Sequence, residues 1–249
     1  MTNGNNDKIV LESIRSKPEI QLSDSTENIN SEDKNSSCST RHVIISVLDV
    51  INHTLIIMVT IYLIYRTLKA KYTITSIHLI LCTIGYVLLM SEAIIVLAGD
   101  NVLTGRWSRR ANKHLHWVLQ AIGLIFNLVG VGIMYNAKTA HFRSIHGITG
   151  ISSLVIVCAV TVFGYPVWIA WKLRKFVRPV ITKFLHNFLG TAGFVIGMVS
   201  QCYAYTKGWL YEASQTEHDV LLALTVLITI LSLRGSLVSL CRQAVGSLT

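Results

Sequence analysis

Long apolar segments alternate with short polar connectors over most of the chain. Six such segments cover residues 43–65, 77–98, 116–135, 146–171, 182–206 and 219–241. Each holds about 20 residues or more, so a helix rising about 1.5 Å per residue can cross a hydrocarbon core about 30 Å thick. Lipid offers no water to the backbone, and the segments are too long for barrel strands, so we expect helices. Short connectors make successive helices antiparallel neighbours. The pattern predicts an all-α membrane protein, a six-transmembrane-helix bundle.

The chain before the first apolar segment has a different composition. Residues 1–41 are rich in Asn, Ser, Asp, Glu and Lys and contain no apolar stretch of the kind found in a cleaved signal peptide. Because such a segment can bury little apolar surface, we expect it to be disordered. The predicted organisation is a disordered cytoplasmic tail (1–41), a six-helix domain (42–242) and a short cytoplasmic C-terminus (243–249).

The overall composition agrees with lipid as the main solvent. The 249 residues are 51% hydrophobic and only 14% charged, whereas about 25% of the residues in a soluble domain are charged. A net charge of +9 is also found in nucleic-acid-binding proteins. Here, however, the Lys and Arg residues lie in the connectors, where membrane topology places them. We therefore expect the lipid membrane, and no nucleic acid, as a partner.

The distribution of Lys and Arg among the connectors predicts the orientation. With the N-terminus in the cytoplasm, nine of these residues fall in inner loops and six in outer loops. The inner residues are Arg106, Arg109, Arg110, Lys113, Lys172, Arg174, Lys175, Arg178 and Lys183. The outer residues are Arg66, Lys69, Lys71, Lys138, Arg143 and Lys207. Cytoplasmic loops carry the excess of positive charge, so both termini are expected in the cytoplasm. The membrane we expect is that of the endoplasmic reticulum or of vesicles.

Four of the nine histidines lie near the N-terminal ends of four successive apolar segments. Because neighbouring helices run in opposite directions, His78 and His146 fall at one level, toward the outside. His116 and His186 fall at the other level, toward the cytoplasm. Histidine pairs on facing helices can hold a flat macrocycle, and two neutral imidazoles suit an electron-transfer haem without an open coordination site. No C-x-x-C-H motif for covalent attachment is present, so the sequence indicates two haem b groups with these histidines as iron ligands.

Glycines follow the histidines at helical spacing and so share a helix face with them. We expect them to leave room for the porphyrin rings. They are Gly123, Gly150, Gly190 and Gly193. Two other interpretations stay open. A histidine near a helix end is often interfacial and a glycine in a membrane helix is often a packing contact, and a proton relay also uses histidines, although it needs no level-matched pairs.

The stretch from Ser76 to Leu210 resembles the cytochrome b561 family, in particular its short branch of cytochrome b561 domain-containing proteins. The resemblance rests on the four histidines in order and on blocks around them. These blocks are Ile77-His78, Leu89-Met-Ser-Glu-Ala93, His116-Trp-Val-Leu-Gln120, Ala140-His141 through His146-Gly147, and Leu185-His-Asn-Phe-Leu-Gly190. One departure is Ile77-His78-Leu79, where some relatives have Trp-His-Pro, and it puts substrate contacts in doubt rather than the haem ligands.

The resemblance implies a dihaem protein that passes electrons across a membrane. His78 and His146 would bind one haem, and His116 and His186 the other. In this family ascorbate is the usual cytoplasmic donor, and ferric iron or monodehydroascorbate is the acceptor on the other side. The resemblance also implies a possible homodimer.

Charged residues next to the histidines are candidates for substrate binding. Ascorbate is an anion, so cations just before His116 and His186 could bind it. These are Arg109, Arg110, Lys113 and Lys183. On the outer side, His141 and Arg143 precede His146 and could contact the acceptor. The alternatives are cations that serve topology alone and a solvated loop histidine.

Ionisable residues also lie inside the apolar segments. Asp49 and His53 are four residues apart in the first segment, and Glu92 lies deep in the second. A carboxylate in a membrane is costly unless it is paired. One role for Glu92 would be to accept the other ring N–H of a haem-ligating histidine. The alternative is hydrogen bonding to nearby backbone or loop cations at the cytoplasmic end.

Two functions from other classes compete with electron transfer. The histidines could serve a proton or small-ion transporter, or the chain could be a membrane scaffold with vestigial haem. Transporter sites favour helices broken at the midplane by Gly or Pro, but the three prolines, Pro18, Pro166 and Pro179, interrupt no span centre.

Overall fold

The computed structural model describes residues 19–69, 72–98, 101–168, 178–206 and 214–248. Side chains are described from Thr40 to Gly246, apart from residues 70–71, 99–100, 165–177 and 207–213. The chain divides into two compact units, residues 1–47 and 48–249. The helical bundle lies in the second unit.

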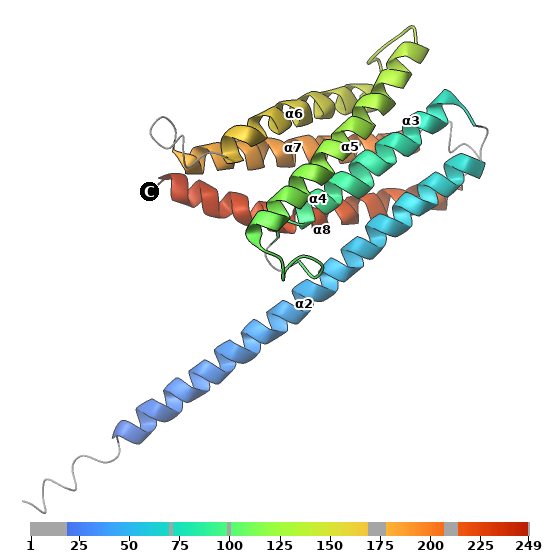
Figure 1. Cartoon of the computed structure of the whole chain (residues 1–249). Helices are drawn as coiled ribbons and strands as arrows, with labels where there is room; N and C mark the ends of the chain where they lie inside the picture. The colour runs from blue at the N-terminus through green and yellow to red at the C-terminus, as the bar shows by residue number, and fades with distance from the viewer. Residues whose placement is uncertain (1–18, 70–71, 99–100, 169–177, 207–213, 249) are drawn as a thin grey trace, which may run out of the picture. The chain divides into compact units, whose positions relative to one another are not determined.

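The described part of the chain is helical (Figure 1). The helices are α2 (Glu19–Lys69), α3 (Ile74–Cys82), η1 (Thr83–Met90), α4 (Ser91–Ile95), α5 (Arg109–Ala137), α6 (Ile145–Trp168), α7 (Pro179–Tyr205) and α8 (Gln215–Leu248). Six stretches are long and apolar enough to cross a membrane. They are Thr40–Lys69, Ile74–Ile95, Arg109–Ala137, Ile145–Gly164, Pro179–Tyr205 and Gln215–Gly246. The predicted all-α, six-span architecture is therefore confirmed.

Local sequence signals set the starts of three helices. Thr73 and Ser76 form a capping box at the start of α3, in which each side chain bonds the other residue's backbone N–H. The Ser108 side chain accepts a hydrogen bond from the backbone of Ala111 and caps α5. Pro179 occupies the first turn of α7, where its missing N–H is harmless. Helix α5 begins at Arg109, seven residues before the predicted segment 116–135. The apolar pattern does not include these residues because the first two turns of α5 are polar.

Helix α2 begins far upstream of its apolar part. It starts at Glu19, directly after Pro18, and no glycine or proline interrupts it as far as Lys69. Residues 1–18 of the predicted tail lie outside the described residues. The disorder predicted for residues 1–41 stays a prediction. The domain boundaries at residues 42 and 242 stay predictions.

The second span is one continuous helical rod, formed by α3, η1 and α4, and its middle part is not α-helical. Residues Thr83–Met90 form a π-helix between α3 and α4. π-Helices are rare in proteins, and those that occur often lie at functional sites. The π-helix places Tyr86 in the bundle core, where its hydroxyl lies 2.7 Å from Oγ of Ser153 on α6. Ser153 in turn donates to the backbone carbonyl of Gly193 on α7, at 2.6 Å. Three helices are thereby joined at mid-span.

The bundle is built from two antiparallel helix pairs. The α3–η1–α4 rod packs along α5, and α6 packs along α7, while α8 contacts both α7 and α4. Helix α2 contributes Ile56, Val59 and Leu63 to the buried core. The opposite faces carry large exposed apolar side chains, such as Val162, which is 73% exposed. Such faces are suited to lipid.

Two of the four glycines expected to leave room for porphyrin are packed against neighbouring helices instead. A Cβ on Gly123 would lie 3.1 Å from the Gly85 carbonyl oxygen, and one on Gly193 would lie 2.9 Å from the Ile156 side chain. The expectation of cleared space is therefore wrong at these two positions, because the antiparallel partner helix fills it. Gly150 and Gly190 are more open, each with a single neighbouring atom within 4 Å of such a Cβ.

Gly197 packs tightly against the second span, and this supports a stability prediction. A Cβ there would overlap the Tyr86 ring and lie 2.8 Å from Oγ of Ser153. We expect Gly197→Ala to lower the free energy of unfolding by about 1–3 kcal/mol, because overpacking must displace a buried ring. At Gly132, where a Cβ would meet nothing within 4 Å, Gly132→Ala is the control and should not destabilise. Thermal unfolding in detergent measures both, and equal melting temperatures would contradict the prediction.

Candidate functional site

The two histidines predicted at the outer level meet in the structure. The rings of His78 on α3 and His146 on α6 have centroids 6.1 Å apart and planes at 82°. Two imidazoles bound to one metal ion at about 2 Å each have centroids roughly 6 Å apart once the nitrogen-to-centroid distances are added. The observed separation therefore fits two axial ligands on opposite faces of a haem.

The inner pair comes from α5 and α7. Its members are His116 on α5 and His186 on α7. Both rings are partly buried. A Cβ on Gly164 of α6 would lie 3.6 Å from Cε1 of His186, so α6 flanks this ring. His116 and His186 each lie seven residues after the first residue of their helix. Their pairing at one level stays a prediction.

Three of the four rings are oriented by backbone carbonyls of the antiparallel helix. The distances from Nδ1 to the carbonyl oxygen are 2.9 Å for His78 and Gly130, 2.7 Å for His116 and Ala93, and 2.9 Å for His146 and Ser200. A carbonyl can only accept, so Nδ1 must carry the proton. Each Nε2 is then left with a lone pair, as an axial ligand to iron requires.

The fourth ring, that of His186, differs from the other three. Among the described residues, its buried Nδ1 has no hydrogen-bond partner. The Ser200 carbonyl of α7 orients the histidine of α6. The α3–η1–α4 rod and α5 orient each other's histidines.

Backbone carbonyls accept the ring N–H of three of the histidines, whereas the sequence pointed to the Glu92 carboxylate as acceptor. The Glu92 carboxylate lies 2.8 Å from Nδ1 of His53 on α2, and His116 bonds the backbone of the next residue, Ala93. The prediction that Glu92 orients a haem ligand is therefore wrong. Ala93 lies in the last turn of α4, where carbonyls lack partners within the helix, so one is available to His116.

Within the part of the chain that the structure describes, no group of three or more His, Cys, Asp or Glu residues could hold a metal ion. The donor set at each level is two neutral imidazoles. Such a set matches iron whose other four ligands come from a porphyrin.

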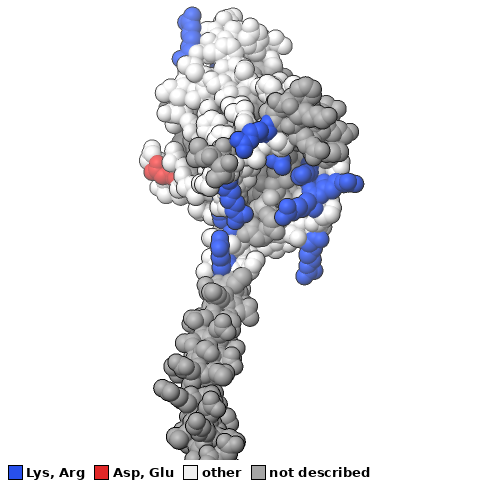
Figure 2. Space-filling model, turned by 90° about the vertical axis from the view of Figure 1, so that its left-hand side faces the viewer, with Lys and Arg blue, Asp and Glu red and all other residues white. Residues whose placement is uncertain are grey.

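The basic residues predicted to bind a donor anion lie at the ends of their helices. Arg109, Arg110 and Lys113 are exposed in the first turns of α5, and Lys183 is exposed near the start of α7. Figure 2 shows several Lys and Arg side chains on one face of the molecule, with few acidic ones. Among the described residues none of the four forms an ion pair. The structure does not show them converging on one point.

The outer candidates lie in the connector between α5 and α6. The His141 ring stacks on Tyr135, with centroids 4.1 Å apart and planes at 19°. Phe142 follows in a left-handed conformation, with φ of 55°, which is strained for a bulky residue. Arg143 is exposed. This aromatic stack directly precedes α6 and His146 in the chain.

Comparison with known proteins covers the same central helices. A family model described as eukaryotic cytochrome b561 matches residues 77–212. That range contains all four histidines and excludes α2 and α8. Matches to curated relatives cover little more than half of this chain. The human protein named Transmembrane reductase CYB561D2 is 28% identical over 148 residues, which are 56% of this chain and 64% of that protein.

A rice protein (Oryza sativa subsp. japonica) is also similar. It is named Probable ascorbate-specific transmembrane electron transporter 1 and is 25% identical over 134 residues, 52% of this chain and 55% of that protein. The chain therefore spans less than two thirds of the length of the curated relatives it matches.

Proposed function

Since the chain belongs to the eukaryotic cytochrome b561 family, we propose that it carries electrons across a membrane, from cytoplasmic ascorbate to an acceptor on the opposite side. The observation that best supports this proposal is the His78–His146 pair. Its ring separation of 6.1 Å suits the two faces of a haem, and the partner-helix carbonyls leave each Nε2 able to bind iron.

Two haem b groups would be held by the four histidines. His78 and His146 would hold the outer one, and His116 and His186 the inner one. Bound haem supplies a centre that takes up and releases one electron at a time. The helices keep both imidazoles of each level in place, and their apolar lipid-facing sides exclude water from the interior.

The two ends of the bundle have different chemistry for substrates. At the inner end, Arg109, Arg110, Lys113 and Lys183 would attract the ascorbate anion. At the outer end, His141 and Arg143 would contact ferric iron chelates or monodehydroascorbate. Stacking on the Tyr135 ring would fix the orientation of the His141 ring. The name of the rice relative supports ascorbate as the donor, and that of the human relative supports a reductase activity.

The proposed setting is an endoplasmic reticulum or vesicle membrane, with both termini in the cytoplasm. The excess of Lys and Arg at the end that carries the first turns of α5 and α7 supports this orientation. A homodimer within that membrane is part of the proposal.

Sealed vesicles test the direction of electron flow. Purified protein is inserted into liposomes that contain ascorbate, and vesicles with the basic end inside are separated from inverted ones. Vesicles with the basic end inside should reduce an external ferric chelate, because Arg109, Arg110, Lys113 and Lys183 at that end would attract the donor anion. Transfer found only in inverted vesicles would show that the orientation is reversed, and protein-free liposomes with ascorbate are the control.

The competing functions predict different spectra. A protein that carries electrons in this way shows a reduced-minus-oxidised b-type spectrum that ascorbate itself produces. A histidine-relay transporter of protons or small ions, or a scaffold with vestigial haem, would not show that ascorbate-dependent change.

A further inference from the structure

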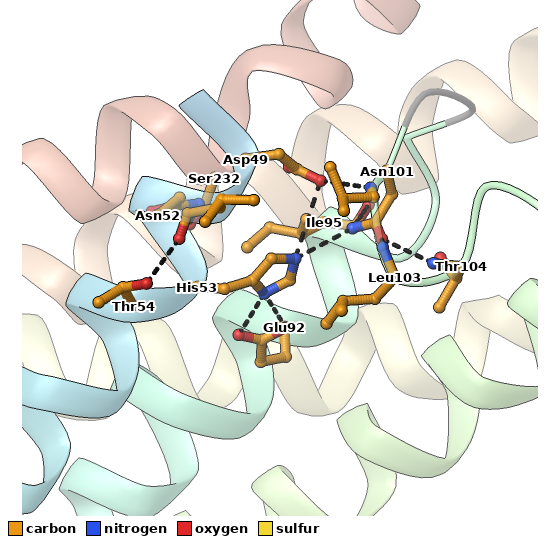
Figure 3. Close-up of polar contacts among 12 residues, drawn as sticks. Asp49, Asn52, His53, Thr54, Glu92, Ile95, Asn101, Leu103, Thr104 and Ser232 are labelled. Carbon is orange, nitrogen blue, oxygen red and sulfur yellow. Dashed lines mark hydrogen bonds and ion pairs between the residues drawn. The ribbon is translucent and has the colours of Figure 1, made fainter. Parts of the chain in front are cut away.

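A buried polar cluster lies at the inner end of the bundle, outside the four-histidine arrangement (Figure 3). It joins Asp49 and His53 of α2 to Glu92 of α4 and to Asn101 in the connector before α5. Asp49 is 4% exposed, His53 is 8% exposed and Asn101 is 2% exposed. Ionisable groups at such burial are costly in a membrane protein unless each has a partner. Their contacts therefore indicate what the cluster does.

His53 is the centre of the cluster and contacts each of its other members. Its Nδ1 atom lies 2.8 Å from the Glu92 carboxylate. On the other side of the ring, Nε2 lies 3.4 Å from Nδ2 of Asn101 and 3.8 Å from a carboxylate oxygen of Asp49. The ring thus bridges α2, α4 and the connector, and Figure 3 shows it between the three.

One arm of the cluster runs through the connector to the first turn of α5. Asp49 accepts a hydrogen bond from the backbone N–H of Val102 at 2.8 Å. The Asn101 side-chain oxygen accepts two more, from Leu103 and Thr104, at 2.8 and 2.9 Å. The Thr104 carbonyl then accepts from the Asn112 side chain at 3.2 Å. These contacts fold the connector against α2 and tie it to the turn of α5 that carries the donor-site cations.

The other arm runs through α4 to an inner histidine. Glu92 bonds His53 with its side chain, and the next residue, Ala93, accepts from Nδ1 of His116 with its carbonyl at 2.7 Å. Successive residues of a helix point about 100° apart, so α4 faces α2 on one side and α5 on another. The position of α4, set by the Glu92–His53 pair, fixes the acceptor that orients the His116 ring.

We propose that His53 is a positioning residue for electron entry. From α2, outside the haem-binding helices, it fixes the position of the donor-binding turn of α5 and the orientation of the His116 ring. The proposal rests on the proposed function for its donor arm, whereas its haem arm requires only that haem is bound. It gives α2, which lies outside the region matched by the family, a role in the reaction at the inner end.

A pure stabilising role is the competing explanation, and α2 offers a matched control for it. Asn52 is 2% exposed and donates a hydrogen bond to Oγ of Ser232 on α8 at 3.1 Å. It lies next to His53 in the chain and joins α2 to α8, but this contact reaches neither the connector nor α4. Asn52→Ala therefore removes a comparable buried contact without touching either arm.

The test compares His53→Ala with Asn52→Ala in purified, haem-loaded protein. We expect His53→Ala to raise the ascorbate concentration for half-maximal haem reduction by about two- to thirtyfold, the usual range for residues that couple distant groups. It should also shift the low-spin electron paramagnetic resonance signal of the inner haem, which reports imidazole orientation. His53→Gln, whose amide can still donate to Glu92, should restore that signal in part.

Two further variants test the connector arm and the α4 arm one at a time. They also test the proposal if His53→Ala does not insert into the membrane. Asn101→Ala should raise the half-maximal ascorbate concentration and leave the resonance signal unchanged. Glu92→Gln should shift the signal. The proposal is overturned if all these variants match Asn52→Ala in both measurements. If ascorbate fails to reduce even the unaltered protein, the proposed function fails, and the resonance signal alone upholds or overturns the positioning of His116.

Discussion

Replacing His116 with alanine removes about half of the haem bound by the protein, because a b-type haem held by one axial imidazole is easily lost. His186→Ala should have the same effect on the inner site, and His78→Ala or His146→Ala should do so at the outer site. The pyridine haemochrome assay on purified protein gives the haem content of each variant. The two variants of one level should resemble each other in spectrum and differ from those of the other level.

The control for these variants is another histidine on the same helix. His114 is exposed in the first turns of α5, and His114→Ala should keep full haem content. A double variant of one level, such as His78→Ala with His146→Ala, should lose no more haem than either single variant. Single variants at His116 or His146 that keep full haem content and unchanged spectra would refute the pairing.

Neutralising Lys113 and Lys183 raises the ascorbate concentration needed for haem reduction, if these cations bind the donor. Each lost charge-assisted contact should weaken binding by on the order of 1–3 kcal/mol, or roughly five- to a hundredfold in affinity. Both side chains are exposed, so the smaller values are expected and the effect should shrink at high salt. An ascorbate titration of the Lys113→Gln, Lys183→Gln variant, read at the haem absorption band, measures it.

Two comparisons separate donor binding from a role in topology alone. An uncharged small reductant should reduce the variant as it reduces the unaltered protein, with haem content unchanged. Lys138→Gln, which removes an exposed cation at the opposite end of α5, is the matched control and should not alter the ascorbate titration. A normal titration for the Lys113→Gln, Lys183→Gln variant would mean that these cations serve membrane insertion only.

Much of the architecture could be predicted from the sequence, because the relevant physics is local. Six apolar stretches of span length dictate six helices in lipid, whatever their neighbours are. The alternation of helix direction then places the four histidines at two levels, and the structure brings His78 and His146 together as this predicts. Helix starts at polar turns, such as Arg109 in α5, were predicted less well because hydropathy reports only the lipid-embedded part.

The partners of the buried polar groups depended on the tertiary structure. Hydropathy and spacing place Glu92 and His116 at similar depth, but the rotation of each helix decides which side chain meets which. In the structure α4 turns Glu92 toward His53 and offers the Ala93 carbonyl to His116.

The same reason applies to the glycines and to the middle of the second span. Gly193 shares a helix face with His186 by spacing, yet its space is filled by the side chain of Ile156 from α6. No sequence signal marks Thr83–Met90 as a π-helix, because a change of helix type depends on packing around Tyr86. The sequence by itself thus determined the spans and the depths of their histidines, through length, hydropathy and alternation of direction. The tertiary structure decided the hydrogen-bond acceptors and the packed faces, because these depend on how the helices rotate against one another.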